Sequence, residues 1–219
     1  MSLEVRKILI YGSSVSTLLP LTIGIITFRR LSKEMVLLTL FLMLICMTEI
    51  IGTMLAQSHR NNLWLFNIYS LMEGLIILYI IARWFDSINA KKALLICSVV
   101  YAISWLYFTL ILSSLFKFNE FENAIKSVLI IIASATLVLK LSLHSTEQIY
   151  QDFRFWVLIS FMFDFSINLV IFCTANFVFE NQENVTKFSW PIHSVTTIFS
   201  NILLMIGYLW YYRKENSYS

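Results

Sequence analysis

The chain has 219 residues, of which 58% are hydrophobic and 13% are charged, and its mean hydropathy is +0.76. Soluble domains are about half apolar and about one quarter charged, so this composition excludes an ordinary soluble protein and predicts an all-helical integral membrane protein. The net charge of +3 is small, and we expect no direct nucleic-acid partner.

Apolar stretches long enough to cross a bilayer recur along the whole chain. A hydrocarbon core of about 30 Å needs about 20 helical residues at about 1.5 Å each. We expect one transmembrane helix in each of seven stretches: residues 8–28, 35–57, 63–84, 93–116, 124–143, 155–178 and 190–212. The connections between them are short, so residues 1–219 form a single transmembrane domain whose function lies in the bundle or on its loops.

The first stretch follows two basic residues, Arg6 and Lys7, as the hydrophobic part of a signal peptide does. It continues to Phe28 without a small-residue cleavage site and ends at Arg29 and Arg30. We therefore expect it to be retained as the first helix.

The Lys and Arg residues divide unequally between the two sides of a seven-span bundle. Six fall on the side of the N-terminus and ten on the side of the C-terminus. Cytoplasmic loops carry an excess of these residues, so the bias predicts an outside N-terminus and a cytoplasmic C-terminus. The expected location is the cytoplasmic (inner) membrane, which the chain crosses several times.

Three acids and one histidine fall within the predicted spans. Glu49, Glu73 and Asp164 lie in the second, third and sixth spans, and His193 lies near the start of the seventh. A charged Asp at the bilayer centre costs about 2.5–3.5 kcal/mol on insertion scales. Each of these side chains should therefore face the bundle interior, a partner or a water-filled cavity.

Helical spacing gives four spans a polar stripe, because residues three or four positions apart share one face. The stripes are Cys46, Glu49 and Thr53; Asn67, Ser70 and Glu73; Ser160, Asp164 and Asn168; and His193, Thr197 and Asn201. We expect these faces to enclose a polar cavity among the second, third, sixth and seventh helices, open to the outside. Its candidate binding and transport residues are Glu49, Asn67, Glu73, Asp164, Asn168, His193 and Asn201.

Interhelical hydrogen bonding is the alternative explanation for these polar residues. Such bonds contribute about 0.6 kcal/mol each on average, which is enough to explain a single Asn or Thr. The three acids and the histidine together cost more than packing requires, and this favours function.

Lysines and cysteines within the spans have simpler interpretations. Lys126 and Lys140 fall near the two ends of the fifth span and are expected to extend to the membrane interfaces. Cys46, Cys97 and Cys173 all lie within spans, and we expect them to pack there without forming disulfides or binding metal.

Weak internal similarity indicates a possible repeat. A shift of 115 residues places Glu49 on Asp164, and a shift of 126 residues places Asn67 on His193. The first three helices would then match the last three in a 3+1+3 parallel repeat, with the fourth as linker. Tryptophans near both interfaces would produce part of this match without any repeat.

The predicted spans lack the residues that several known functions of membrane proteins require. The last span has no lysine for a retinal Schiff base, and only His193 lies within a span, so we expect no metal and no cofactor. Ser160 or Ser194 could join His193 and Asp164 in a hydrolase triad, but no nucleophile motif accompanies them. An enzyme is the least favoured class, and no catalytic residue is assigned.

Two segments, "NNLWLFNIYSLMEG" and "WPIHSVTTIFSNIL", resemble recurrent segments of small seven-span membrane proteins of Bacteroidota-type bacteria. The resemblance implies no activity. It rests on Asn67, Tyr69, Glu73, Trp190, His193 and Asn201.

The 3+1+3 layout also loosely resembles SWEET and nicotinamide-riboside transporters. Their proline-glutamine pair is missing, because Leu21 follows Pro20 and Ile192 follows Pro191. The resemblance therefore implies no particular substrate.

These features favour a protein that binds and transports a small polar or cationic solute. Glu73 and Asp164 would bind the solute or exchange a proton with it at the midplane, and the other candidates would shape the outward entry. One alternative is a membrane sensor or signalling subunit that docks a cytoplasmic protein on its basic loops, "RRLSK" and "INAKK". Another is a homo-oligomeric ion channel or pore-forming effector, for example in a bacterial defence system, in which the acids line a cation path.

Overall fold

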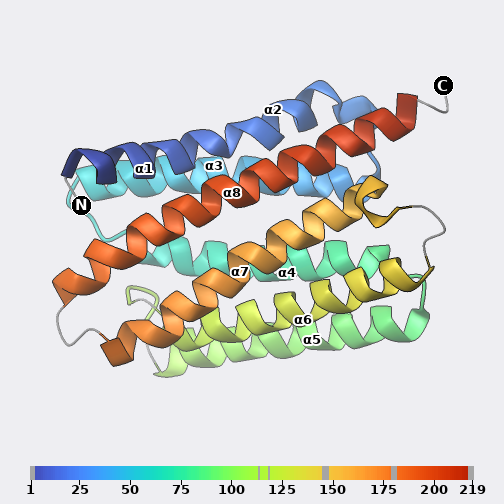
Figure 1. Ribbon diagram of the computed structural model, residues 1–219. Helices are drawn as coiled ribbons and strands as arrows, with labels where there is room; N and C mark the ends of the chain where they lie inside the picture. The colour runs from blue at the N-terminus through green and yellow to red at the C-terminus, as the bar shows by residue number, and fades with distance from the viewer. Residues whose placement is uncertain (1–2, 113, 118, 145–147, 179–181, 217–219) are drawn as a thin grey trace.

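The computed structural model describes residues 3–112, 114–117, 119–144, 148–178 and 182–216, which form helices and turns without a strand (Figure 1). Among these residues, the side chains of 3, 6, 7, 120, 144, 172–178, 182–190, 215 and 216 are not described. The elements in order are α1 Leu3–Ser16, α2 Leu18–Ile26, η1 Phe28–Arg30, α3 Lys33–Gln57, α4 Leu63–Trp84, α5 Ile88–Leu106, the π-helix η2 Tyr107–Leu112, α6 Glu120–His144, η3 Ile149–Gln151, α7 Phe153–Val178 and α8 Gln182–Asn216.

Seven of the described helical segments are long and apolar enough to cross a membrane, which confirms the predicted number and indicates a multi-pass membrane protein. They are Ile8–Ile26, Lys33–Gln57, Leu63–Trp84, Ile88–Leu112, Phe121–Leu143, Phe153–Ile171 and Pro191–Lys214. The fourth begins at residue 88, before the predicted 93, because the helix continues through Lys91 and Lys92, whose long side chains reach water from a membrane end.

The first span is interrupted, whereas the sequence predicted one helix over residues 8–28. α1 ends at Ser16, and α2 begins at Leu18. Pro20 explains the interruption, because it has no N–H for the carbonyl of residue 16 and its ring collides with that carbonyl. The hydroxyls of Ser16 and Thr17 at the break are buried and available to a neighbouring helix.

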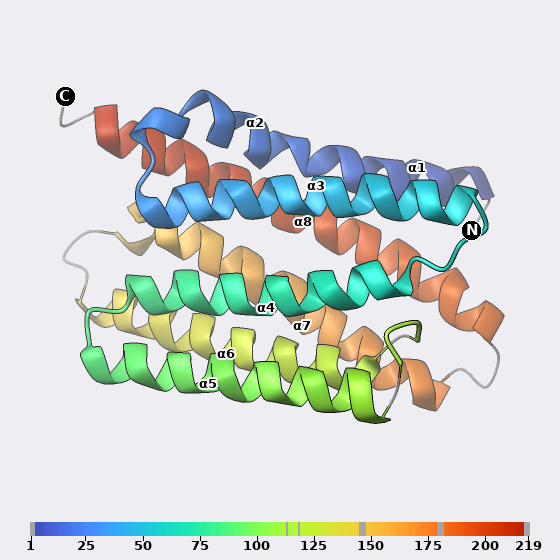
Figure 2. The same cartoon turned by 180° about the vertical axis from the view of Figure 1, so that it is seen from behind.

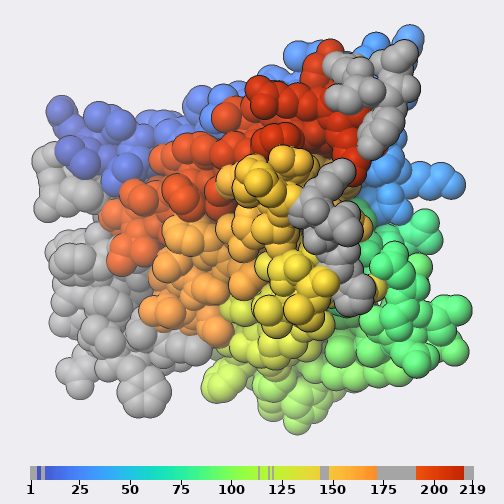
Figure 3. Space-filling model, turned by 45° about the vertical axis from the view of Figure 1, so that its right-hand side comes forward, coloured from blue at the N-terminus to red at the C-terminus, as the bar shows by residue number. Residues whose placement is uncertain are grey.

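The helices form two layers. α1, α2, α8, α7 and α6 face the viewer in Figure 1, and α3, α4 and α5 face the viewer in Figure 2. The chain begins at one end of the bundle and finishes at the other, and we call these ends the N-terminal side and the C-terminal side. From the C-terminal side, α8 packs closely against α7 (Figure 3).

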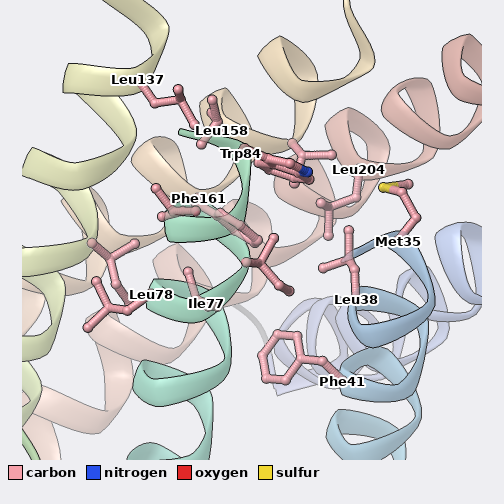
Figure 4. Packing of buried hydrophobic residues seen from close by; sticks show 14 of the residues in the cluster. Met35, Leu38, Phe41, Ile77, Leu78, Trp84, Leu137, Leu158, Phe161 and Leu204 are labelled. Atoms are coloured by element: carbon pink, nitrogen blue, oxygen red, sulfur yellow. The ribbon is translucent and has the colours of Figure 1, made fainter. Parts of the chain in front are cut away.

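An apolar core fills the half of the bundle nearer the C-terminal side. It is built from the first turns of α3, the last turns of α4, the later part of α6 and the facing parts of α7 and α8 (Figure 4). Its fully buried side chains include Met35, Leu38, Ile81, Leu137 and Leu158. A buried polar side chain in this half is Thr39, whose hydroxyl oxygen lies 2.8 Å from that of Tyr208.

An aromatic contact closes the core at the C-terminal side. The ring of Phe153 on α7 meets Trp84 on α4 at 6.0 Å and Tyr211 on α8 at 4.8 Å, both edge to face. The hydroxyl of Tyr211 accepts from the N–H of Ser32 at 2.8 Å, which ties α8 to the start of α3. These contacts join the helices that carry the predicted midplane acids.

Candidate functional site

The N-terminal half of the bundle contains a group of buried polar side chains between α4, α5 and α6. Ser70 and Glu73 come from one face of α4, Tyr101 comes from α5, and the first turns of α6 supply the rest. We call this group the charged cluster: Ser70, Glu73, Tyr101, Glu122, Asn123 and Lys126.

Lys126 is the centre of the charged cluster. Its Nζ donates to Glu73 Oε2 at 2.5 Å, to Ser70 Oγ at 2.7 Å and to Asn123 Oδ1 at 3.0 Å. The ring of Phe165 on α7 lies 5.8 Å from the same nitrogen. The three ammonium hydrogens thus have three acceptors, and the charge has a carboxylate partner.

The structure corrects the expectation that Lys126 reaches the membrane interface, because the residue is only 5% exposed. α6 begins at Glu120, before the predicted 124, so Lys126 lies further along its helix than expected. The preceding connection is also packed inward against α4, which brings this part of α6 level with Glu73.

Glu122 is a buried acid that the sequence analysis missed. It is 0% exposed, and its carboxyl group contacts the Tyr101 hydroxyl and lies 3.2 Å from Ser70 Oγ. Its N–H donates to Asn119 Oδ1 at 3.2 Å, as in a helix N-cap. The segment "NEFE" has the pattern of a helix N-terminus, an Asn followed three residues later by Glu. Helix N-termini of this kind usually lie in water, and the predicted span begins only at residue 124.

A second polar group runs along α7 to α8, as the spacing of its residues predicted. Asn168 Nδ2 donates to Asp164 Oδ2 at 2.9 Å, and Asn168 Oδ1 lies 2.8 Å from His193 Nδ1. The amide oxygen can only accept, so Nδ1 of His193 carries the hydrogen. The carboxyl of Asp164 interacts electrostatically with Glu73 and Lys126, which connects this group to the charged cluster.

Asn67 and Asn201 each hydrogen-bond another segment of the bundle. Asn67 Nδ2 donates to the carbonyl oxygens of Leu115 and Lys117, each at 2.8 Å. It thereby satisfies the non-helical backbone between α5 and α6, which is tolerated at membrane depth only when buried in protein. Asn201 Nδ2 donates to Ser16 Oγ at 2.8 Å, at the break in the first span.

Glu49 lies half-buried on α3. Ser14 on α1 and Tyr69 on α4 are both close enough to interact with it. Tyr69 in turn donates its hydroxyl hydrogen to Glu73 Oε1 at 2.8 Å. Glu49 is therefore near the hydrogen-bonded pair of Tyr69 and Glu73.

The sequence predicted a polar cavity in the bundle and no metal site. A hollow of about 130 Å³ lies at the C-terminal end of α8, lined by Ile206, Leu209, Trp210 and Arg213, and is separate from the charged cluster. The cavity among the four polar helices stays a prediction. In the described part of the chain, no three His, Cys, Asp or Glu side chains are grouped to hold a metal ion.

The cysteines were expected to pack within the spans. Cys46 and Cys97 are half-buried free thiols. The side chains of Cys173 and Trp190 lie outside the described residues.

Gly74 allows Tyr101 to reach the charged cluster. A Cβ at this position would lie 2.5 Å from Cε1 of Tyr101 and 3.1 Å from its hydroxyl oxygen. We expect Gly74→Ala to push the ring away from Glu122 and to lower the free energy of unfolding by about 1–3 kcal/mol. Thermal unfolding of the purified protein measures this, with Gly12→Ala as the matched control, since a Cβ there meets only Ile198 at 3.6 Å. Equal melting temperatures for the two variants would refute the role of Gly74.

Comparisons with protein-family models, curated proteins and solved structures give no significant match to this chain.

Proposed function

We propose that the protein binds a small polar or cationic solute and carries it across the membrane, with Glu73 and Asp164 as the groups that take the solute or a proton. The observation that supports this most directly is the ratio of charges in the bundle. Glu73 pairs directly with the ammonium of Lys126, and Glu122 and Asp164 lie close enough to interact with it electrostatically. One ammonium compensates one carboxylate, so the other two acids need protons or a cation.

The distribution of polar and apolar groups supports entry from the N-terminal side. The charged cluster and the Asp164–Asn168–His193 group occupy that half, while the apolar core and the Phe153 contact close the other. Release on the C-terminal side requires the rings of Trp84, Phe153 and Tyr211 to separate. This arrangement fits one state of an alternating-access cycle.

The proposal includes an orientation and a location. The excess of Lys and Arg on the C-terminal side supports an outside N-terminus in the cytoplasmic membrane, so the solute enters from outside. The parallel repeat and the bacterial family resemblance stay predictions. A sensor or a homo-oligomeric pore would use the same acids, and a transport assay distinguishes both from a transporter.

A thermal-shift screen tests solute binding. We expect at least one small cation or polar metabolite to raise the melting temperature of the purified protein. A bound ligand increases the free energy of unfolding by RT ln(1 + [L]/Kd), which is about 2.7 kcal/mol when the ligand concentration is about 100 times Kd. Screening at about pH 5.5 and about pH 7.5, on both sides of the ordinary histidine pKa, separates ligands that compete with protons from those that do not.

Two substitutions serve as controls for this screen. The shift should vanish in Asp164→Asn and persist in Lys92→Ala, because Lys92 is exposed at the C-terminal side. A shift that survives Asp164→Asn would exclude Asp164 from the binding site. A screen with no shift from any compound would count against solute binding.

A further inference from the structure

Glu122 is the most completely buried acid of the charged cluster. It is 0% exposed, and three helices surround it. The titratable groups that face it are Tyr101 from α5, Glu73 from α4 and Lys126 from α6. Of these, Lys126 is the cation, and its hydrogens go to Glu73, Ser70 and Asn123.

The hydrogens around Glu122 allow two arrangements, and one of them places a proton on the carboxyl group. The Tyr101 hydroxyl has one hydrogen, and it lies 2.9 Å from the carbonyl oxygen of Ser70, which can only accept. When that bond is made, the close contact between the same hydroxyl and Glu122 Oε1 requires a hydrogen on the carboxyl group. In that arrangement the Tyr101 oxygen accepts from Glu122 and donates to Ser70, whereas in the other arrangement Tyr101 donates its hydrogen to Glu122 Oε1.

The neighbouring hydroxyl does not supply the missing hydrogen. Ser70 Oγ also has one hydrogen, and its shortest acceptor is Asn123 Oδ1 at 2.9 Å, compared with 3.2 Å to either oxygen of Glu122. An ionised Glu122 would therefore be a fully buried carboxylate that has the Tyr101 hydroxyl as its one close donor, while the hydrogens of Lys126 go to other acceptors. Such a group costs several kcal/mol, which a proton removes.

We propose that Glu122 holds a proton in the resting protein and that a cationic solute displaces it. The second half rests on the proposed function. When the cation enters the charged cluster, the O–H bond of Glu122 breaks and its proton passes to water on the N-terminal side. The carboxylate that remains neutralises the incoming cation, so the charge of the site is unchanged. Glu122 would thus couple one proton to one monovalent cation.

Infrared spectroscopy of the protein tests the resting proton without any solute. We expect a carbonyl stretch of a protonated carboxyl group that shifts when all Glu residues carry ¹³C-labelled carboxyl groups, and that is lost in Glu122→Gln but kept in Asp164→Asn. Glutamine resembles a protonated Glu because its amide can donate to Tyr101, so this variant should melt within about 2–4 °C of the parent chain.

The outcomes are decisive in each case. A band that persists in Glu122→Gln, or the absence of any protonated band that shifts with Glu labelling, would overturn the proposal. If Glu122→Gln does not fold, a Glu-labelled band that is kept in both Glu73→Gln and Glu49→Gln still assigns the proton to Glu122, because the label already separates Glu bands from Asp bands. The infrared result does not depend on transport, so its failure would leave the proposed function standing.

Proton release tests the second half. Adding ethylammonium, Na⁺ or K⁺ to the protein in weakly buffered solution should acidify the medium if the cation binds, whereas Glu122→Gln, which lacks the neutralising carboxylate, should bind the cation more weakly and release no proton. Binding with no proton release from the parent chain would overturn the coupling. Absence of binding by any cation tried would count against the proposed function as well.

Discussion

Replacing Lys126 with methionine is expected to lower the free energy of unfolding by about 3–5 kcal/mol. The substitution keeps a long apolar stem but leaves Glu73, whose side chain is 16% exposed, without its ammonium partner. It also removes the donor to Ser70 Oγ and Asn123 Oδ1. The double variant Lys126→Met with Glu73→Gln removes both charges, so we expect it to recover most of the loss. Thermal unfolding of the purified proteins measures both effects.

The matched control is Lys140→Met on the same helix. Lys140 Nζ lies 2.9 Å from Asp86 Oδ2, but the Asp86 side chain is 89% exposed, and such pairs contribute about 0–1 kcal/mol. The hydrogen bond from Lys140 lowers the pKa of Asp86, so this small contribution is present above the ordinary Asp pKa and is lost as pH falls through the lowered value. If Lys126→Met and Lys140→Met have the same melting temperature, the charged cluster does not hold a buried ion pair.

Asp164→Asn and Glu73→Gln are each expected to reduce transport to background while the protein remains folded. The amide oxygen of an asparagine at 164 can still accept from Asn168 Nδ2, and that of a glutamine at 73 can still accept from Tyr69. Neither substitute can exchange a proton or carry a negative charge at neutral pH. Asp164→Asn thus keeps its hydrogen bond and loses only the titratable oxygen. Glu73→Gln also leaves the buried ammonium of Lys126 without a carboxylate, so we expect this variant to fold with a lowered free energy of unfolding.

Folding of these two variants is the control for their loss of transport. Each should elute as the parent protein does in size-exclusion chromatography and should unfold cooperatively. If both variants aggregate or fail to accumulate in the membrane, the acids are structural and the interpretation of the cluster as a transport site is refuted.

The helices could be predicted from the sequence because their signal is local. Hydropathy and length alone identify the seven spans, and the third coincides with α4 at both ends. The break near Ser16 was missed although Pro20 was visible, because a proline in a membrane helix does not always interrupt it.

The arrangement of Asp164 and Asn168 in the candidate site could also be predicted from local sequence. The spacing of Asp164 and Asn168 places both on one face of α7, and the structure adds that His193 on α8 meets that face. Asn201 shares the predicted stripe with His193, but its partners are Ser16 and Thr17. A stripe fixes which side chains share a face and does not fix the helix opposite.

Lys126 and Glu122 show what the sequence could not reveal. Near a predicted helix end, such residues usually reach water. Here the connection between α5 and α6 is bonded to Asn67 within the bundle, and this tertiary contact buries the start of α6. The depth of a helix end depends on such contacts, which hydropathy does not report.

The most direct test of a cation transporter is proton movement in vesicles that contain the purified protein and a pH-sensitive dye. Adding Na⁺, K⁺ or choline to vesicles with an acidic lumen should raise the lumenal pH for at least one cation, in the parent protein and in Lys92→Ala, but not in Asp164→Asn. Lumenal pH that responds to none of these cations, or that responds equally in Asp164→Asn, would contradict proton-coupled cation transport through these acids.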